Sequence, residues 1–172
     1  MRPYGAGRLF RGFAAPKPPL LKALGSKHMN TSELENKLLE EGCNPNNFCI
    51  GSSGVKSDIY CLSKNYGKWS IYYTERGLNS KPIYESRNEA EACDFYCKEI
   101  VAIEHWHNVG FFESDDLALK LQQELEVAGI KVIRNDMPPL KAGGPKIRRV
   151  FVVGKDIFKV KGMYASLPIK NA

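Results

Sequence analysis

Hydrophobic positions recur at helical spacing shortly after the first 30 residues of the chain. Leu34 and Leu38 lie one turn apart, and Ser32 with Glu35 matches the Ser-x-x-Glu capping box that begins many helices. Gly42 follows as a residue that can end a helix in the left-handed conformation. The pattern therefore predicts a short amphipathic helix between Ser32 and Gly42.

Two later segments show the same periodicity. Ser86 and Glu89 form a second capping box, so we expect a helix over about 87–105. Its predicted core positions are Ala90, Cys93, Cys97, Ile100 and Val101. A third helix is predicted from the cap Ser114 to Gly129, with acidic residues in its first turn. Its predicted core positions are Leu117, Leu121 and Leu125.

Runs of β-branched and aromatic residues predict strands between these helices. Residues 59–63, 69–74 and 81–85 are separated by turn-forming segments, which favours an antiparallel meander. A loop is expected before it, over 44–57. One face of the middle run carries Trp69, Ile71 and Tyr73.

Three further strands are predicted over 109–113, 130–134 and 149–153, with a loop rich in Pro and Gly over 135–148. The order of elements predicts an α+β protein, in which an αβββα unit with an antiparallel meander is followed by a βαββ unit. The expected organisation is a flexible arm at 1–28, the αβββα unit at 29–107, the βαββ unit at 108–156 and a C-terminal tail at 157–172.

The positive charge is concentrated at the amino terminus. The formal net charge is +6, but residues 1–28 hold six bases and no acid, so the rest of the chain balances 19 bases with 19 acids. A neutral body lacks the excess of cations that nucleic-acid binding uses.

We interpret residues 1–28 as an appended peptide, because Gly-Ser-Lys-His-Met at 25–29 resembles a cloning junction. On this interpretation the native start is Met29. The alternative is a mitochondrial transit peptide, although the Pro and Gly residues oppose the helix that such peptides form.

The composition also bears on the compartment. No apolar run approaches the roughly 18 residues of a membrane span, and no secretory h-region is visible. The five cysteines are odd in number and lack metal-finger spacing, which favours a reducing compartment over a disulfide framework. For Cys93 and Cys97, which share a helix face, we expect core packing rather than redox or metal chemistry. We predict a cytoplasmic protein without membrane contact.

No catalytic motif is visible. Phosphate loops, dinucleotide fingerprints, nucleophile elbows and zinc-protease motifs are absent from the sequence, so we do not expect an enzyme. His105 and His107 would share one side of an extended segment, which suits metal ions, but no Asp, Glu or Cys at evident spacing completes a ligand set. A helix-end role for histidine is the simpler interpretation, and we expect neither a metal nor a cofactor.

Two features suit binding to phosphate or bases. Cations flank a Gly-rich backbone in the last loop, where the choice is between anion binding and a solvated hairpin connection. These cations are Lys141, Lys146, Arg148 and Arg149. The meander aromatics could stack bases, although about half of them must fill the core. These aromatics are Tyr66, Trp69, Tyr72 and Tyr73. A small nucleic-acid-binding module is therefore the alternative function.

The hairpin stretch WSIYYTERG at 69–77 and the capped helix at 88–100 resemble small bacterial immunity proteins that are encoded beside polymorphic or contact-dependent-inhibition toxins. The resemblance covers roughly 31–156, with 112–117 and its helix as a looser second match. It implies a cytoplasmic, non-catalytic protein that binds one toxin domain, often a nuclease, and blocks or distorts its active site. Many partners of nucleases are acidic, whereas this body is neutral.

The predicted partner is thus a cognate toxin domain, and nucleic acid is not expected as a partner. The predicted interface residues are Tyr72, Glu75, Arg76, Asp115 and Asp116. Tyrosine and arginine are favoured at interface centres, and acidic side chains at a turn and a helix start could meet the basic groove of a nuclease. The identity of the toxin and the oligomeric state do not follow from the sequence.

Overall fold

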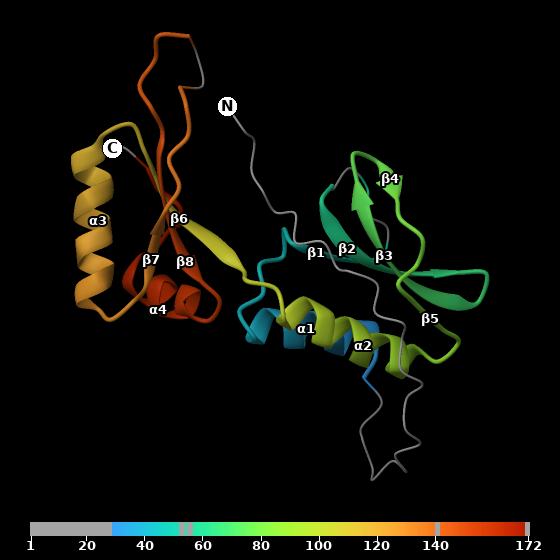
Figure 1. Ribbon diagram of the computed structural model, residues 1–172. Coiled ribbons are helices and arrows are strands. Elements are labelled where there is room, and N and C mark those ends of the chain that lie inside the picture. Colours follow the sequence, from blue (N-terminus) through green and yellow to red (C-terminus); the bar gives the residue numbers. More distant parts are fainter. Residues whose placement is uncertain (1–28, 52–53, 55–56, 140–141, 171–172) are drawn as a thin grey trace.

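The computed structural model describes residues 29–51, 54, 57–139 and 142–170. In this part of the chain, four helices and nine strands form an α+β protein with two mixed sheets (Figure 1). The α+β class predicted from the sequence is confirmed. The predicted arm at 1–28 lies outside the described residues.

The first unit holds a sheet of five strands. Its elements are α1 (Thr31–Glu40), β1 (Phe48–Ile50), β2 (Ile59–Asn65), β3 (Lys68–Glu75), β4 (Leu78–Asn79), β5 (Tyr84–Ser86) and α2 (Glu89–Val101). Strand β3 pairs antiparallel with β2, and it also pairs antiparallel with β4 and β5. Helices α1 and α2 lie together against one face of this sheet (Figure 1).

The unit differs from the predicted αβββα order because two short strands are added. Strand β1 lies inside the segment expected as a loop and pairs parallel with β2. Phe48 supplies the reason, since it is buried in the core beneath the helices. Strand β4 forms the short hairpin at the end of β3.

The helix starts differ from the predicted capping boxes. Asn30, rather than Ser32, caps α1: its Oδ1 accepts from the backbone N–H groups of Ser32 and Glu33 at 3.0 Å. Asn88, rather than Ser86, caps α2. The side-chain oxygen of asparagine reaches the exposed amides of the first turn as well as a serine hydroxyl does, so the nearer asparagine determines where each helix begins.

The predicted helix ends at Gly42 and Gly129 are confirmed. Both glycines have positive φ, +76° and +73°, and follow α1 and α3 (Asp115–Val127) in the same hydrogen-bond pattern. After α1, the N–H groups of Gly42 and Cys43 donate to the carbonyls of Leu39 and Leu38. This is the Schellman motif, in which a left-handed residue satisfies the last helical carbonyls.

The second unit extends further than predicted. Its elements are β6 (Trp106–Phe112), α3 (Asp115–Val127), β7 (Val132–Arg134), β8 (Arg148–Val153), α4 (Asp156–Met163) and β9 (Ile169–Lys170). The strand order is β7-β8-β6-β9, with β9 parallel to β6. Helix α4 and strand β9 lie where a C-terminal tail was expected, and the unit is therefore βαββαβ rather than βαββ. Ile157 and Val160 explain the extension, because both are buried in the core of this unit.

Each unit has its own hydrophobic core. Cys93 and Cys97 are buried in the first core, as predicted. Leu121 and Leu125 are buried in the second core as predicted, but Leu117 is 42 % exposed because Ala118 takes the inward position at the start of α3. Val101, at the end of α2, is likewise exposed.

All five cysteines are buried and form no disulfide. Burial raises the pKa of Cys43 to about 11 and that of Cys93 to about 12. A thiol whose pKa is higher in the folded than in the unfolded protein contributes to stability. The contribution is complete at pH values below the unfolded pKa, and it is lost as the pH rises through the folded pKa. We expect the thiols of the native protein to resist a disulfide reagent at pH 8, whereas all five thiols react in urea. We also expect the free energy of unfolding to fall above about pH 9. Rapid labelling of the native protein would contradict this expectation.

No helix in the described part of the chain combines the length and the apolar character that crossing a bilayer requires.

Candidate functional site

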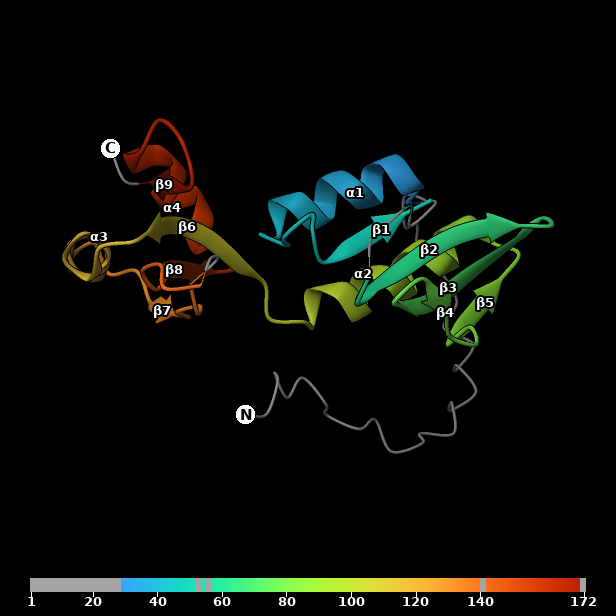
Figure 2. The same cartoon turned by 90° about the horizontal axis from the view of Figure 1, so that it is seen from above.

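The structure divides the predicted interface residues between the two units. Tyr72, Glu75 and Arg76 lie on β3 and the turn after it, whereas Asp115 and Asp116 begin α3. Figures 1 and 2 both place α3 at the end of the molecule away from β3 and β4. The five residues therefore do not form one continuous patch.

The hairpin between β3 and β4 presents an arginine at its tip. Glu75 and Leu78 are paired, and the two residues between them, Arg76 and Gly77, have φ of +50° and +80°. Positive φ at both central residues is the type I′ geometry that suits the twist of a hairpin. The Arg76 N–H donates to Ser57 Oγ at 2.6 Å, which ties the turn to the start of β2, while its side chain is exposed.

A surface hollow of about 330 Å³ lies along this hairpin. It is lined by Tyr73, Glu75, Arg76, Leu78, Asn79 and Ser80. Leu78 is 76 % exposed and adds apolar area to this hollow. Burial raises the pKa of the Tyr73 phenol, and the carboxylates of Asp58 and Glu75 raise it further. We name Tyr73, Glu75, Arg76 and Leu78 the hairpin surface.

Tyr72 lies on the other face of the sheet, half-buried against a small cluster of Cys49, Ile59 and Cys61. It shares that face because it pairs with Cys61 across β2 and β3. Tyr72 is therefore separated from the Tyr73 side of the hairpin surface by the alternation of the strand.

Asp115 and Asp116 differ in their surroundings. Asp115 Oδ1 lies 2.8 Å from Arg134 Nη2 and 3.1 Å from Arg148 Nε, and both arginines also reach Asp136. The hydrogen bond from Arg134 is the main reason why the pKa of Asp115 lies below its usual value. Asp115 is thus engaged within its own unit, whereas Asp116 is exposed and makes no ion pair with the described residues.

The cations of the last loop do not converge on one anion site. Lys141 lies outside the described residues and Lys146 is exposed. Arg148 is paired with the two aspartates, while Arg149 donates from Nε and Nη2 to Asn135. Neighbouring strand residues project to opposite faces, which separates the two arginines.

The meander aromatics also fail to form one stacking surface. Trp69 is buried under the helices, Tyr72 lies on the opposite face, and Tyr66 is fully exposed in the turn between β2 and β3. The alternation along β3 explains the separation. The geometry therefore gives the nucleic-acid alternative no platform at the meander.

The two histidines are engaged in structural contacts. His105 is buried, and its Nε2 donates to the Ile100 carbonyl in the last turn of α2 at 2.9 Å, which is the predicted helix-end role. His107 Nε2 donates to the Gly42 carbonyl at 2.8 Å, and burial lowers the pKa of this imidazole. No group of three or more His, Cys, Asp and Glu side chains in the described ranges is arranged to hold a metal ion.

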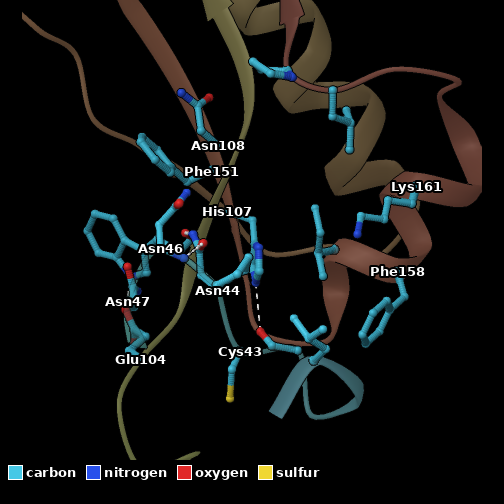
Figure 3. A pocket seen from close by; sticks show the side chains of 17 residues that line it. Cys43, Asn44, Asn46, Asn47, Glu104, His107, Asn108, Phe151, Phe158 and Lys161 are labelled. Atoms are coloured by element: carbon cyan, nitrogen blue, oxygen red, sulfur yellow. Dashed lines mark hydrogen bonds between the residues drawn. The ribbon is translucent and has the colours of Figure 1, made fainter. Parts of the chain in front are cut away.

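A cavity of about 980 Å³ lies where the two units meet (Figure 3). The His107–Gly42 bond crosses this joint, as does a 2.6 Å bond from Asn44 Nδ2 to the Trp106 carbonyl. Figure 3 shows Asn46, Asn47, Asn108 and Phe151 on one side of His107, and Lys161 and Phe158 on the other. The cavity is therefore a groove that runs past the start of β6 and is lined by residues of both units.

Sequence reasoning missed the outer face of the second sheet. Helices α3 and α4 cover the face that carries Val150 and Val152, and strand pairing places seven half-buried side chains on the opposite face. We name these residues the open face: Trp106, Asn108, Phe111, Ile133, Arg149, Phe151 and Val153. The signal was the alternation of Arg149 and Phe151 with buried valines in β8, which marks a second, partly apolar face.

Comparisons with family models, with curated proteins and with the solved structures find no match to this chain.

Proposed function

We propose that this chain is an immunity protein, which binds a cognate toxin domain and neutralises it through a protein–protein interface. The observation that carries the proposal is the type I′ turn at the hairpin surface, where Arg76 occupies a left-handed position beside the exposed Leu78. The resemblance of 69–77 to immunity proteins falls on the same hairpin.

The arginine in this turn carries a conformational cost. Left-handed backbone costs an L-residue other than glycine, asparagine or aspartate roughly 1 kcal/mol, so Asn-Gly is the stable choice for a type I′ turn. Tyr66 carries the same cost in the turn between β2 and β3, so the cost alone does not mark a contact site; Arg76 differs in lying beside a surface hollow and the exposed Leu78. Arginine and tyrosine are the residues that most often dominate interface energies, and an apolar neighbour such as Leu78 adds area that a partner can bury.

A non-catalytic role fits the described side chains. Both imidazoles of the described chain donate to backbone carbonyls, and burial keeps the thiols of Cys43 and Cys93 protonated near neutral pH. A base–nucleophile pair needs a free imidazole or carboxylate within hydrogen-bond reach of the nucleophile. We therefore propose that the activity is sequestration of the toxin.

Arg76→Asn is expected to separate folding from binding. Asparagine tolerates the left-handed turn, so the free energy of unfolding should stay equal or rise by up to about 1 kcal/mol. Binding to the toxin domain encoded beside this chain should weaken by at least about 1.5 kcal/mol, as for loss of an interfacial charge. Calorimetric titration gives the affinity, and denaturant melts give the stability.

Tyr66→Asn is the matched control. Tyr66 occupies the same left-handed position, φ +50°, in the type I′ turn between β2 and β3, at the opposite end of β3. This variant should show the same gain in stability with unchanged affinity. Equal affinity of the wild type and Arg76→Asn would remove the hairpin surface from the interface, and the absence of any complex with the toxin domain would refute the proposed function.

A further inference from the structure

The open face has the composition of a binding surface rather than of a solvated sheet. Trp106 and Phe151 pack together with ring centroids 5.8 Å apart, and the Arg149 guanidinium lies over the Phe151 ring at 5.3 Å. All three side chains remain half-buried, because the helices of this unit lie on the other face. Tryptophan, phenylalanine and arginine are enriched at the centres of protein interfaces.

The charge on this face is positive. Its strands carry Arg149 and Lys170 but no acidic residue, because Lys170 pairs with Phe111 and so joins the same side. Glu104, at the rim, already accepts from the Trp106 indole N–H. No described carboxylate pairs with Arg149, which donates from Nε and Nη2 to Asn135.

The face also contains an unsatisfied acceptor. Asn108 Oδ1 is buried and has no hydrogen-bond partner in the described structure. Because this oxygen is enclosed by its surroundings, a donor from a partner reaches it only if the Asn108 side chain turns outward. Figure 3 shows Asn108 on the same side as Phe151, Asn46 and Asn47, which line that side of the groove at the joint.

We propose that the open face binds an acidic, extended segment of the toxin domain. A carboxylate of the segment pairs with Arg149, and an apolar side chain covers Trp106 and Phe151. This inference rests on the proposed function. It adds a second contact surface, separate from the hairpin surface, and specifies that the contacting segment of the partner is acidic.

Two other occupants fit the face less well. A nucleic acid needs several clustered cations to displace its counterions, and the face offers two. A second copy stacked on the same face would bring two positively charged faces together. An acidic protein segment matches the charge of the face and can cover its aromatic side chains.

The test uses the full chain and the toxin domain encoded beside it. Arg149→Glu should lower the affinity of the complex about tenfold or more. Lys170 is exposed, so Lys170→Glu should leave the fold intact and lower the affinity severalfold. Lys120→Glu is the matched control, since it changes the net charge equally on α3, behind the opposite face, and should leave the affinity within about twofold. Melting curves of each variant report folding.

A second readout follows the tryptophans. Trp69 is buried, so Trp69→Phe leaves Trp106 as the emission reporter for the open face. Its fluorescence should shift when the toxin domain is added and stay constant with a 12-nucleotide oligothymidylate. A complex that forms with wild-type affinity in both Arg149→Glu and Lys170→Glu would overturn the inference while leaving the proposed function intact. If neither the wild type nor any variant forms a complex, the proposed function is refuted. If the Trp106 fluorescence shifts with the oligonucleotide and not with the toxin domain, the face is assigned to nucleic acid.

Discussion

Tyr96→Phe is expected to lower the free energy of unfolding by about 2–3 kcal/mol, although it removes a single oxygen atom. The Tyr96 hydroxyl is buried where α2 meets β1 and β2. It accepts from the Cys49 N–H at 3.0 Å and lies 2.8 Å from the Cys49 carbonyl and 2.7 Å from the Tyr60 carbonyl. The hydroxyl therefore bonds to the backbone of both parallel strands, β1 and β2.

The effect is large because the lost bonds are buried. A buried hydrogen-bonding group that loses its partner costs about 1–3 kcal/mol, and phenylalanine can neither donate nor accept. Denaturant melts of Tyr96→Phe measure the loss, with Tyr66→Phe as the control because Tyr66 is fully exposed. Equal stability of the two variants would show that water or another group replaces the Tyr96 hydroxyl.

Gly42→Ala should be more damaging still, with an expected loss of about 3 kcal/mol. A Cβ at this position would lie 2.6 Å from Gly154 C and from Lys155 N, which are backbone atoms of the second unit. Alanine would also have to adopt φ +76°. Relief of the contact requires the end of α1 to move away from the turn before α4, and the Gly42–His107 bond across the joint would be lost with it.

Gly129→Ala separates the cost of the close backbone contact from the cost of the left-handed conformation. Gly129 ends α3 in the same motif with φ +73°, but nothing lies within 4 Å of the Cβ that alanine would add. This variant should therefore lose only the conformational part, about 1 kcal/mol. Denaturant melts of both variants give the difference, and equal losses would mean that the two units are not held at this distance in solution.

The surroundings of the candidate interface residues could be predicted only where they depend on neighbours in sequence. The exposed Arg76 and Glu75 follow from a turn between two alternating runs, because a two-residue hairpin determines its own backbone. The pairing of Asp115 with Arg134 and Arg148 could not be read from the sequence, since it depends on β7 and β8 lying beside the start of α3. The division of the predicted interface between two units has the same origin.

The sequence by itself determined the elements whose signals are local: the helix ends at Gly42 and Gly129, the burial of Cys93 and Cys97, and the α+β class. Tertiary structure decided the rest. Strand β1 has only three residues and exists because Phe48 is buried and β2 offers a parallel partner, and α4 forms over Ile157 and Val160. The open face likewise arises only because α3 and α4 pack on one side of the second sheet. Periodicity reports which residues share a face of an element, but which face is covered depends on contacts between segments distant in sequence.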